Sequence, residues 1–324
     1  MKAILKHPML NGWRLFWLLS LPMCGFIVAD LLQTDLSQGE GISHMIGYSV
    51  RWAVPFIYLV TAASSFQILF PGAFGMWWLR NRKFLGLCFA VGMAWQGLFI
   101  FIISTFYREY YFGEIYAFRD ELEGTIGYIF LAAMVVTSFK IGHKLVSSEQ
   151  WKLIQKGGVY FLWAYPFSVY WWNIFYYPQL DPTREPRSID YIFYVLGFAA
   201  FAMRIAAWGK RRHKKLSTPT PILMTAFGAL FMLLGAVGSV TGHLWYDGAY
   251  AVLYGPAPSE NASAWLPFWP LEPFLPLLSI GLGTWITTLR PGKLAAGKPF
   301  TLEMGTTSST SLSNMCTFNS SVSS

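Results

Sequence analysis

Eight long apolar runs, separated by short polar segments, dominate this sequence. A helix needs about 20 apolar residues in succession to cross the hydrocarbon layer of a bilayer. The runs are continuously apolar rather than alternating, which favours helices over the strands of a membrane barrel. They cover residues 13–32, 48–70, 84–106, 122–139, 157–177, 189–208, 222–243 and 266–289. We therefore predict an all-α, polytopic membrane protein with eight transmembrane helices.

The polar segments between the runs alternate in the sign of their charge. If the N-terminus lies inside, only five of the 24 Lys and Arg residues fall outside, namely Arg51, Arg108, Arg119, Arg184 and Arg187. Most acidic residues fall on that outer side. Because basic residues gather on the cytoplasmic side of a membrane, both termini are predicted to be cytoplasmic, in a multi-pass protein of the plasma (cytoplasmic) membrane.

Composition agrees with this assignment. Only 12% of the residues are charged, whereas soluble domains carry about 25%. The net charge of +8 is divided among short inter-helix segments, so it predicts orientation and no nucleic-acid partner. The cysteines Cys24, Cys88 and Cys316 form no CxxC motif, so neither a zinc site nor a redox pair is expected. No GxGxxG motif follows a predicted strand, so the chain is not expected to carry its own flavin or nicotinamide domain.

The predicted organisation has five parts. These are a cytoplasmic N-terminus (1–12), a six-helix membrane core (13–208), a basic cytoplasmic loop (209–221), two additional transmembrane helices (222–289) and a cytoplasmic tail (290–324). The tail is Ser/Thr-rich from residue 305 onward, so it is predicted to be largely disordered.

Three segments of the core carry a resemblance to a known family. A basic loop at residues 80–83 runs into Leu85-Gly86-Leu87, Thr137-Ser138 closes the fourth run, and a basic linker then leads to Trp151. In order and spacing, over residues 47–208, these segments resemble the ferric reductase-like transmembrane domain family. Within it they are most similar to the haem-containing membrane subunits of periplasmic methionine-sulfoxide reductase systems. The resemblance implies a six-helix scaffold and leaves the last two runs outside the match.

The same resemblance implies haem-ligating histidines on the third and fifth helices, and this chain lacks them. Counting along the motifs places Gln96, Gln155 and Ser168 at the family positions of those ligands. A bis-histidine haem needs imidazole nitrogens on facing helices, which amide and hydroxyl groups do not replace. The histidines that are present, at 7, 143, 213, 44 and 243, are predicted near the two membrane surfaces. No haem cofactor is therefore predicted.

Three functions are compatible with these observations. The first is a haem-less membrane scaffold or partner subunit, in contact with the bilayer and with another membrane or periplasmic protein. The second, by analogy of fold, is an electron-transfer oxidoreductase subunit linked to haem b, a quinone or a flavoprotein. The third is a small-solute transporter, which the prolines at 267, 270, 273 and 276 leave open. Gln96 and Ser168 are interpreted either as filling the former haem cavity or as lining a polar pocket for a quinone or lipid headgroup.

Other polar residues are candidates for metal, proton-relay or lipid-contact sites. His243 and Asp247 are four residues apart, and His44 is predicted at the same surface as Asp30, so these are weak candidates for a divalent metal or a proton relay. Arg204, near the end of a run, is expected to extend to the membrane surface. A basic cluster is predicted to contact anionic lipid at the inner leaflet. It consists of Lys210, Arg211, Arg212, Lys214 and Lys215.

Overall fold

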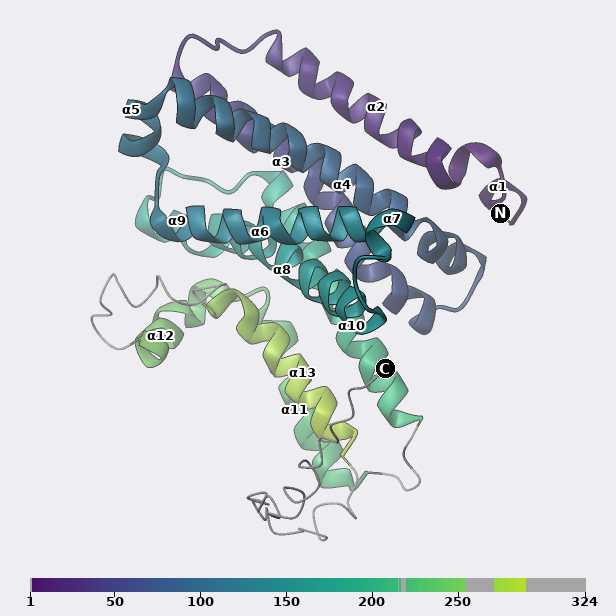
Figure 1. Cartoon of the computed structure of the whole chain (residues 1–324). Helices are drawn as coiled ribbons and strands as arrows, with labels where there is room; N and C mark the ends of the chain where they lie inside the picture. Colours follow the sequence, from purple (N-terminus) through teal and green to yellow (C-terminus); the bar gives the residue numbers. More distant parts are fainter. Residues whose placement is uncertain (1, 215, 217–219, 255–270, 290–324) are drawn as a thin grey trace, which may run out of the picture. The chain divides into compact units, whose positions relative to one another are not determined.

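The computed structural model describes residues 2–214, 216, 220–254 and 271–289 (Figure 1). The longer helices are α2 (Gly12–Leu31), α3 (Gly39–Leu69), α4 (Ala73–Phe106), α6 (Phe118–Thr137), α8 (Ser148–Phe175), α10 (Ser188–His213), α11 (Ile222–Gly238), α12 (Gly242–Tyr254) and α13 (Leu275–Thr287). Short helical segments connect or precede them: α1 (Lys2–Leu5), η1 (Pro8–Leu10), α5 (Arg108–Tyr110), the π-helical η2 (Tyr111–Ile115), α7 (Lys140–His143), α9 (Tyr177–Leu180) and η4 (Glu272–Phe274). No strand occurs among these described residues, so the predicted all-α class is confirmed for them.

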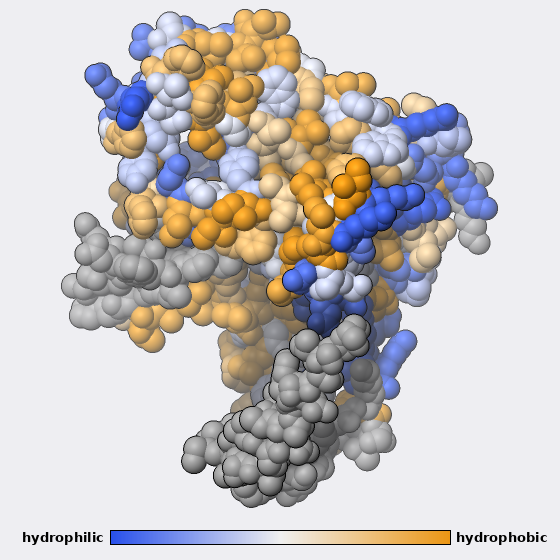
Figure 2. All heavy atoms as spheres, in the orientation of Figure 1, coloured by the Kyte–Doolittle hydropathy of each residue, from blue (hydrophilic) through white to orange (hydrophobic). Residues whose placement is uncertain are grey.

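Four of the described helices are long and apolar enough to cross a membrane: α2, α3, α4 and α10. The bent pair α11 and α12 would make a fifth if it counted as one span. Many large apolar side chains on the described helices are exposed. Ile222, on α11, is 90% exposed, and Ile129, on α6, is 63% exposed. Figure 2 shows apolar residues covering much of the visible surface of the described helices. Such a surface is expected of helices that face lipid.

The remaining predicted spans do not reach the length and apolarity of a span in the described residues, so the number eight is not confirmed. Helix α6 begins with charged residues in its first two turns, and α8 begins with a polar segment that includes Lys152 and Lys156. Helix α13 has 13 residues and follows the 3-10 turn η4, which contains Pro273. Part of the eighth predicted run, with Pro267 and Pro270, lies outside the described residues, as does the predicted tail at 290–324.

The seventh predicted run is interrupted, which corrects the prediction of one helix over residues 222–243. Helix α11 ends at Gly238, and α12 starts at Gly242 after a bend of 109°. The break is stabilised because its carbonyls find new donors: Tyr194 donates to the Ser239 oxygen at 2.6 Å, and Trp245 donates to the Gly238 oxygen at 2.9 Å. These bonds replace the helical ones that a helix end leaves unmade.

Successive long helices run in opposite directions, so charged segments gather at two ends of the bundle. We call the ends by their charge: the acidic end holds residues 30–40, 109–123 and 181–190, and the basic end holds residues 80–83, 140–156 and 210–214. At the acidic end, His44 pairs with Asp30 at 2.9 Å. At the basic end, Lys83 donates to the Ser138 oxygen at 2.6 Å. Residues far apart in the sequence therefore meet at the end that their charge predicts.

Helix α8 supplies much of the core, because aromatic side chains line its buried faces. Phe167 and Trp171 are fully buried, and Trp163 stacks on Phe201 of α10 with ring centroids 4.2 Å apart. The Trp163 indole nitrogen donates to the Gly197 oxygen at 2.9 Å. Helix α8 packs against α3, α6 and α10, so it can be less apolar than an isolated span and still lie within the bundle.

Helices α11 and α13 pack backbone to backbone through glycines. A methyl group at Gly228 would lie 2.6 Å from the Gly283 oxygen, and one at Gly283 would lie 2.3 Å from the Gly228 oxygen. Gly235 approaches the Pro276 oxygen in the same way, at 2.4 Å. Small residues commonly allow helices in membranes to approach closely. The pair Gly238 and Gly242, which has this spacing in the sequence, is instead separated by the bend.

We predict that Gly228→Ala destabilises the protein, because its methyl group would overlap the α13 backbone. Overpacking of this kind costs about 1–3 kcal/mol. Gly281→Ala is the matched control, since a Cβ there meets nothing within 4 Å. Thermal unfolding in detergent should show a lower midpoint for Gly228→Ala alone. Equal midpoints for the two variants would contradict the glycine contact.

Candidate functional site

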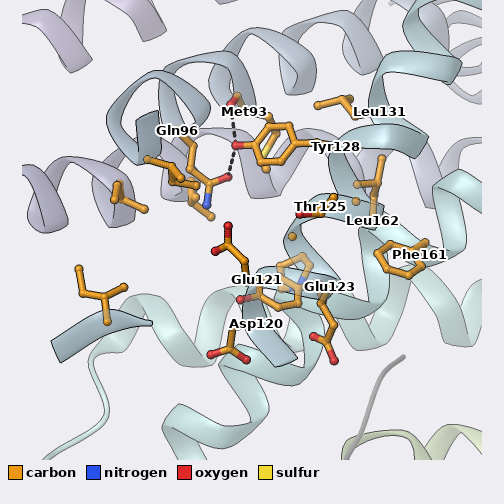
Figure 3. A pocket seen from close by; sticks show the side chains of 18 of the residues that line it. Met93, Gln96, Asp120, Glu121, Glu123, Thr125, Tyr128, Leu131, Phe161 and Leu162 are labelled. Atoms are coloured by element: carbon orange, nitrogen blue, oxygen red, sulfur yellow. Dashed lines mark hydrogen bonds between the residues drawn. The ribbon is translucent and has the colours of Figure 1, made fainter. Parts of the chain in front are cut away.

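A cavity of about 300 Å³ lies between α3, α4, η2, α6 and α8 toward the acidic end (Figure 3). We call it the acidic-end cavity. Its apolar lining includes Ile46, Val50, Val54, Phe89, Met93, Ile100, Ile115, Leu131, Phe161, Leu162 and Pro166. Its polar lining includes three carboxylates, Asp120, Glu121 and Glu123, and the pair Gln96 and Tyr128. The cavity thus joins an apolar interior to a polar, negatively charged rim.

Gln96, at a family ligand position, is held by Tyr128 of α6. The Tyr128 hydroxyl lies 3.0 Å from Gln96 Oε1 and 3.1 Å from the Met93 oxygen, so one hydroxyl hydrogen is shared between two acceptors. Figure 3 shows the rest of the Gln96 amide directed into the cavity, toward the side from which Glu121 extends. The amide NH₂ group can therefore donate to a molecule bound there.

Glu121 is oriented by Tyr111, a buried residue of the π-helical segment η2. The Tyr111 hydroxyl donates to Glu121 Oε2 at 2.5 Å. Burial raises the pKa of Tyr111 well above its ordinary value, and the hydrogen bond to Glu121 raises it further, so the hydroxyl keeps its proton. Asp120 and Glu121 also lie in the first turn of α6, where negative charge is favoured by the helix dipole. The helix dipole of α6 therefore accounts in part for the position of these carboxylates.

Gln155, at the second family ligand position, has a different role. Its Nε2 donates to the Met134 oxygen at 3.1 Å and to Thr137 Oγ1 at 3.2 Å, at the C-terminal end of α6. Trp151 donates to the Thr137 oxygen at 3.2 Å. Both residues therefore join α8 to the carbonyl end of α6, where helical hydrogen bonds are missing.

Gln155 also lines a second cavity of about 250 Å³, at the basic end. Its rim includes Arg82, Lys83 and His143. Three side chains, those of Phe89, Leu131 and Leu162, line both cavities. The two cavities therefore lie end to end between α3, α4, α6 and α8, separated by a buried apolar layer with opposite charge on its two sides.

Ser168, at the third family ligand position, lines neither cavity. Its hydroxyl donates to the Tyr165 oxygen of its own helix at 2.8 Å. Ser168 therefore does not line the cavity that Gln96 lines, and the hydroxyl that contacts Gln96 is that of Tyr128. A tyrosine within an otherwise apolar run can indicate a buried hydrogen bond, as it does for Tyr128. Its partner Gln96 is 32 residues away, however, and no spacing rule predicts that pair.

The residues of these cavities do not fit a haem. No described histidine lines the acidic-end cavity, and His143, which is exposed, is the histidine that lines the basic-end cavity. Neither cavity offers the two facing imidazoles of a bis-histidine site. The carboxylates at the acidic rim would also repel the negatively charged propionates of a haem. We derive no chemistry through haem in this chain.

The weak metal candidates are separated in the structure. His44 binds Asp30 at 2.9 Å, as expected from their predicted place at one surface. His243 and Asp247 are both exposed and lie on α12, not on a continuation of α11. Within the described part of the chain, no three His, Cys, Asp or Glu residues come together in a group that could hold a metal ion.

Two members of the predicted basic cluster use their donors within the protein. Lys210 donates to the Ile68 oxygen at 2.8 Å and the Leu69 oxygen at 3.2 Å, at the C-terminal end of α3. Arg212 donates from Nε to Thr288 Oγ1 at 2.9 Å. Arg211 and Lys214 are exposed, so lipid contact stays a prediction for them. Lys215 lies outside the described residues.

Comparison with known proteins found no matching family model, no matching curated protein and no matching solved structure. The resemblance to ferric reductase-like proteins therefore stays a prediction that rests on the sequence motifs.

We predict that the purified, dithionite-reduced protein shows no haem absorption. The reason is the absence of paired imidazoles from both cavities. The measurement is a visible absorbance spectrum of protein expressed with added haem precursor, with a b-type cytochrome from the same host as a positive control. A sharp reduced-minus-oxidised band at the b-type positions, in proportion to protein, would contradict the prediction.

Proposed function

We propose that the chain is a multi-pass protein of the plasma membrane with eight spans and both termini in the cytoplasm. Four apolar helices of membrane-crossing length support this proposal, and so does the separation of charge between the two ends of the bundle. Helices α6, α8 and α13 complete the set of eight with α11. Polar residues of these helices that are satisfied within the bundle, as Gln155 is, lower the apolarity that the helices need compared with a span surrounded by lipid.

We propose further that this protein is a haem-less membrane subunit that binds a small amphipathic molecule in the acidic-end cavity. The single observation that carries the proposal is the lining of that cavity: an apolar interior closed by Phe89, Leu131 and Leu162, with Gln96 on the wall and carboxylates at the rim. Ligand sites are typically concave, mostly apolar and equipped with a few converging polar groups. A molecule with an apolar body and a hydrogen-bonding head, such as a quinone or a lipid headgroup region, matches this arrangement.

The charge of the rim sets the direction of approach. A ligand that enters from the acidic end passes the carboxylates first and meets the apolar layer last, beyond which lies the basic-end cavity. The cavity therefore receives its ligand from the acidic end and is closed toward the basic end by the apolar layer. This arrangement suits a subunit that holds a ligand for a partner at the acidic end. The partner in this proposal is another membrane protein or a protein on the outer side, and the function is scaffolding without redox chemistry.

Filling the acidic-end cavity should abolish ligand retention. Gly124 lines the cavity and a Cβ there meets nothing within 4 Å, so Gly124→Leu places apolar atoms in the cavity without a local clash. Gly25→Leu is the matched control, because Gly25 is an exposed helical glycine on α2 with equally open space. The small molecules extracted from each purified protein would be compared by mass spectrometry.

A molecule present in the wild type and in Gly25→Leu should fall about tenfold or more in Gly124→Leu, a loss of roughly 1.4 kcal/mol in binding. Bulk lipid alone in all three samples, or a specific molecule at equal amounts in all three, would contradict the proposed site.

A further inference from the structure

The side chain of Arg204, which its sequence position led us to expect at the membrane surface, binds to two neighbouring helices of the bundle. Its Nη1 donates to the Thr61 oxygen of α3 at 2.9 Å, and its Nη2 donates to the Tyr160 hydroxyl of α8 at 3.0 Å. The guanidinium also lies over the Tyr160 ring, 4.5 Å from its centroid. A charged residue inside the apolar part of a membrane protein is costly and commonly marks a functional site. The positive charge of Arg204 is therefore fixed within the bundle.

This charge borders a third cavity, of about 700 Å³, between α8, α10, η4 and α13. We call it the Arg204 cavity. Apart from Arg204 its described lining is aromatic and aliphatic, and includes Trp163, Trp208 and Leu277. Among the described residues that line the cavity, Arg204 is basic and none is acidic. The cavity therefore combines a long apolar space with one positive charge.

The Arg204 cavity is open toward the surface that would face lipid. Leu278 is 60% exposed, and Leu282 and Trp208 are also exposed. Gly281 lies between these two leucines on α13, and a Cβ there would meet nothing within 4 Å. An acyl chain from the bilayer can reach this space without any change in the helices.

More positive charge follows toward the basic end. Arg212 lies over the Trp208 ring, 5.0 Å from its centroid. Along α10, eight residues separate Arg204 from Arg212, which is about 12 Å at the rise of an α-helix. Arg212 thus contacts Trp208, a residue of the cavity lining, and lies toward the basic end, where the exposed Arg211 and Lys214 are also found.

We propose that the Arg204 cavity holds an anionic phospholipid of the bilayer. One acyl chain lies in the apolar space, Arg204 donates to the ester region through the donors that Thr61 and Tyr160 do not use, and the phosphate lies toward Arg212. Charge complementarity selects an anionic lipid over a zwitterionic one. This site is separate from the acidic-end cavity and does not depend on the function proposed for it.

Native mass spectrometry of the full chain, mixed with equal amounts of phosphatidylglycerol and phosphatidylcholine, tests the proposal. The variants are Gly281→Leu, which fills the cavity, and the exposed control Gly25→Leu. The wild type and Gly25→Leu should retain one phosphatidylglycerol about fivefold more strongly than phosphatidylcholine, the effect expected of one basic residue near a lipid phosphate. Gly281→Leu should lose this adduct, and inorganic phosphate should not displace it from the wild type.

Arg204→Gln separates charge from shape. It should keep a lipid adduct but lose the preference for phosphatidylglycerol, and its thermal unfolding midpoint would be measured in the same samples to confirm folding. If Arg204→Gln does not fold, the result for Gly281→Leu decides alone. Equal retention of the two lipids by the wild type, or retention by Gly281→Leu equal to that of Gly25→Leu, would overturn the proposal. Displacement by inorganic phosphate would also overturn it, because it would indicate a simple anion site.

Discussion

Polar groups that these helices carry into the bundle need partners there, because lipid offers none. This constraint accounts for the long-range hydrogen bonds of the structure. Lys210 donates to the carbonyls at the end of α3, Gln155 donates at the end of α6, and Tyr194 donates to the carbonyl freed where α11 bends. Each bond joins a side chain to a helix end that the backbone leaves incomplete. Such bonds at helix ends therefore join the helices of the bundle, together with those that Trp163 and Arg204 make within helices.

The same constraint gives different roles to the two glutamines that the predicted resemblance places at ligand positions. The Gln155 amide donates to groups at the end of α6 and has a structural role. Gln96 is held through its oxygen by Tyr128, which leaves its nitrogen directed into a cavity. Gln155 thus joins two helices, and Gln96 places a polar group on an apolar wall. For this reason, we place the site for the amphipathic molecule in the acidic-end cavity and not in the basic-end cavity.

The helical class and the approximate positions of the first six apolar runs could be predicted from the sequence, because apolar segments of membrane-crossing length have few other solutions. The bend after Gly238 could not be predicted, since Ser239, Val240 and Thr241 interrupt no hydropathy pattern and the bend depends on Tyr194 and Trp245. Asp30 and His44, which the sequence placed at one surface, lie 2.9 Å apart. Tyr128, Tyr111 and the binding of Arg204 were missed, because each depends on contacts between distant helices that no local spacing encodes.

We propose that the acidic and basic ends of this bundle lie on opposite sides of a membrane. This proposal is tested most directly with two single-cysteine variants, Ser37→Cys and Ser148→Cys, in a chain from which Cys24, Cys88 and Cys316 have been removed. Both serines are exposed, one at each end. In intact cells, a membrane-impermeant maleimide should label position 37, and it should label position 148 only after permeabilisation. Labelling of both positions from the same side would contradict the account.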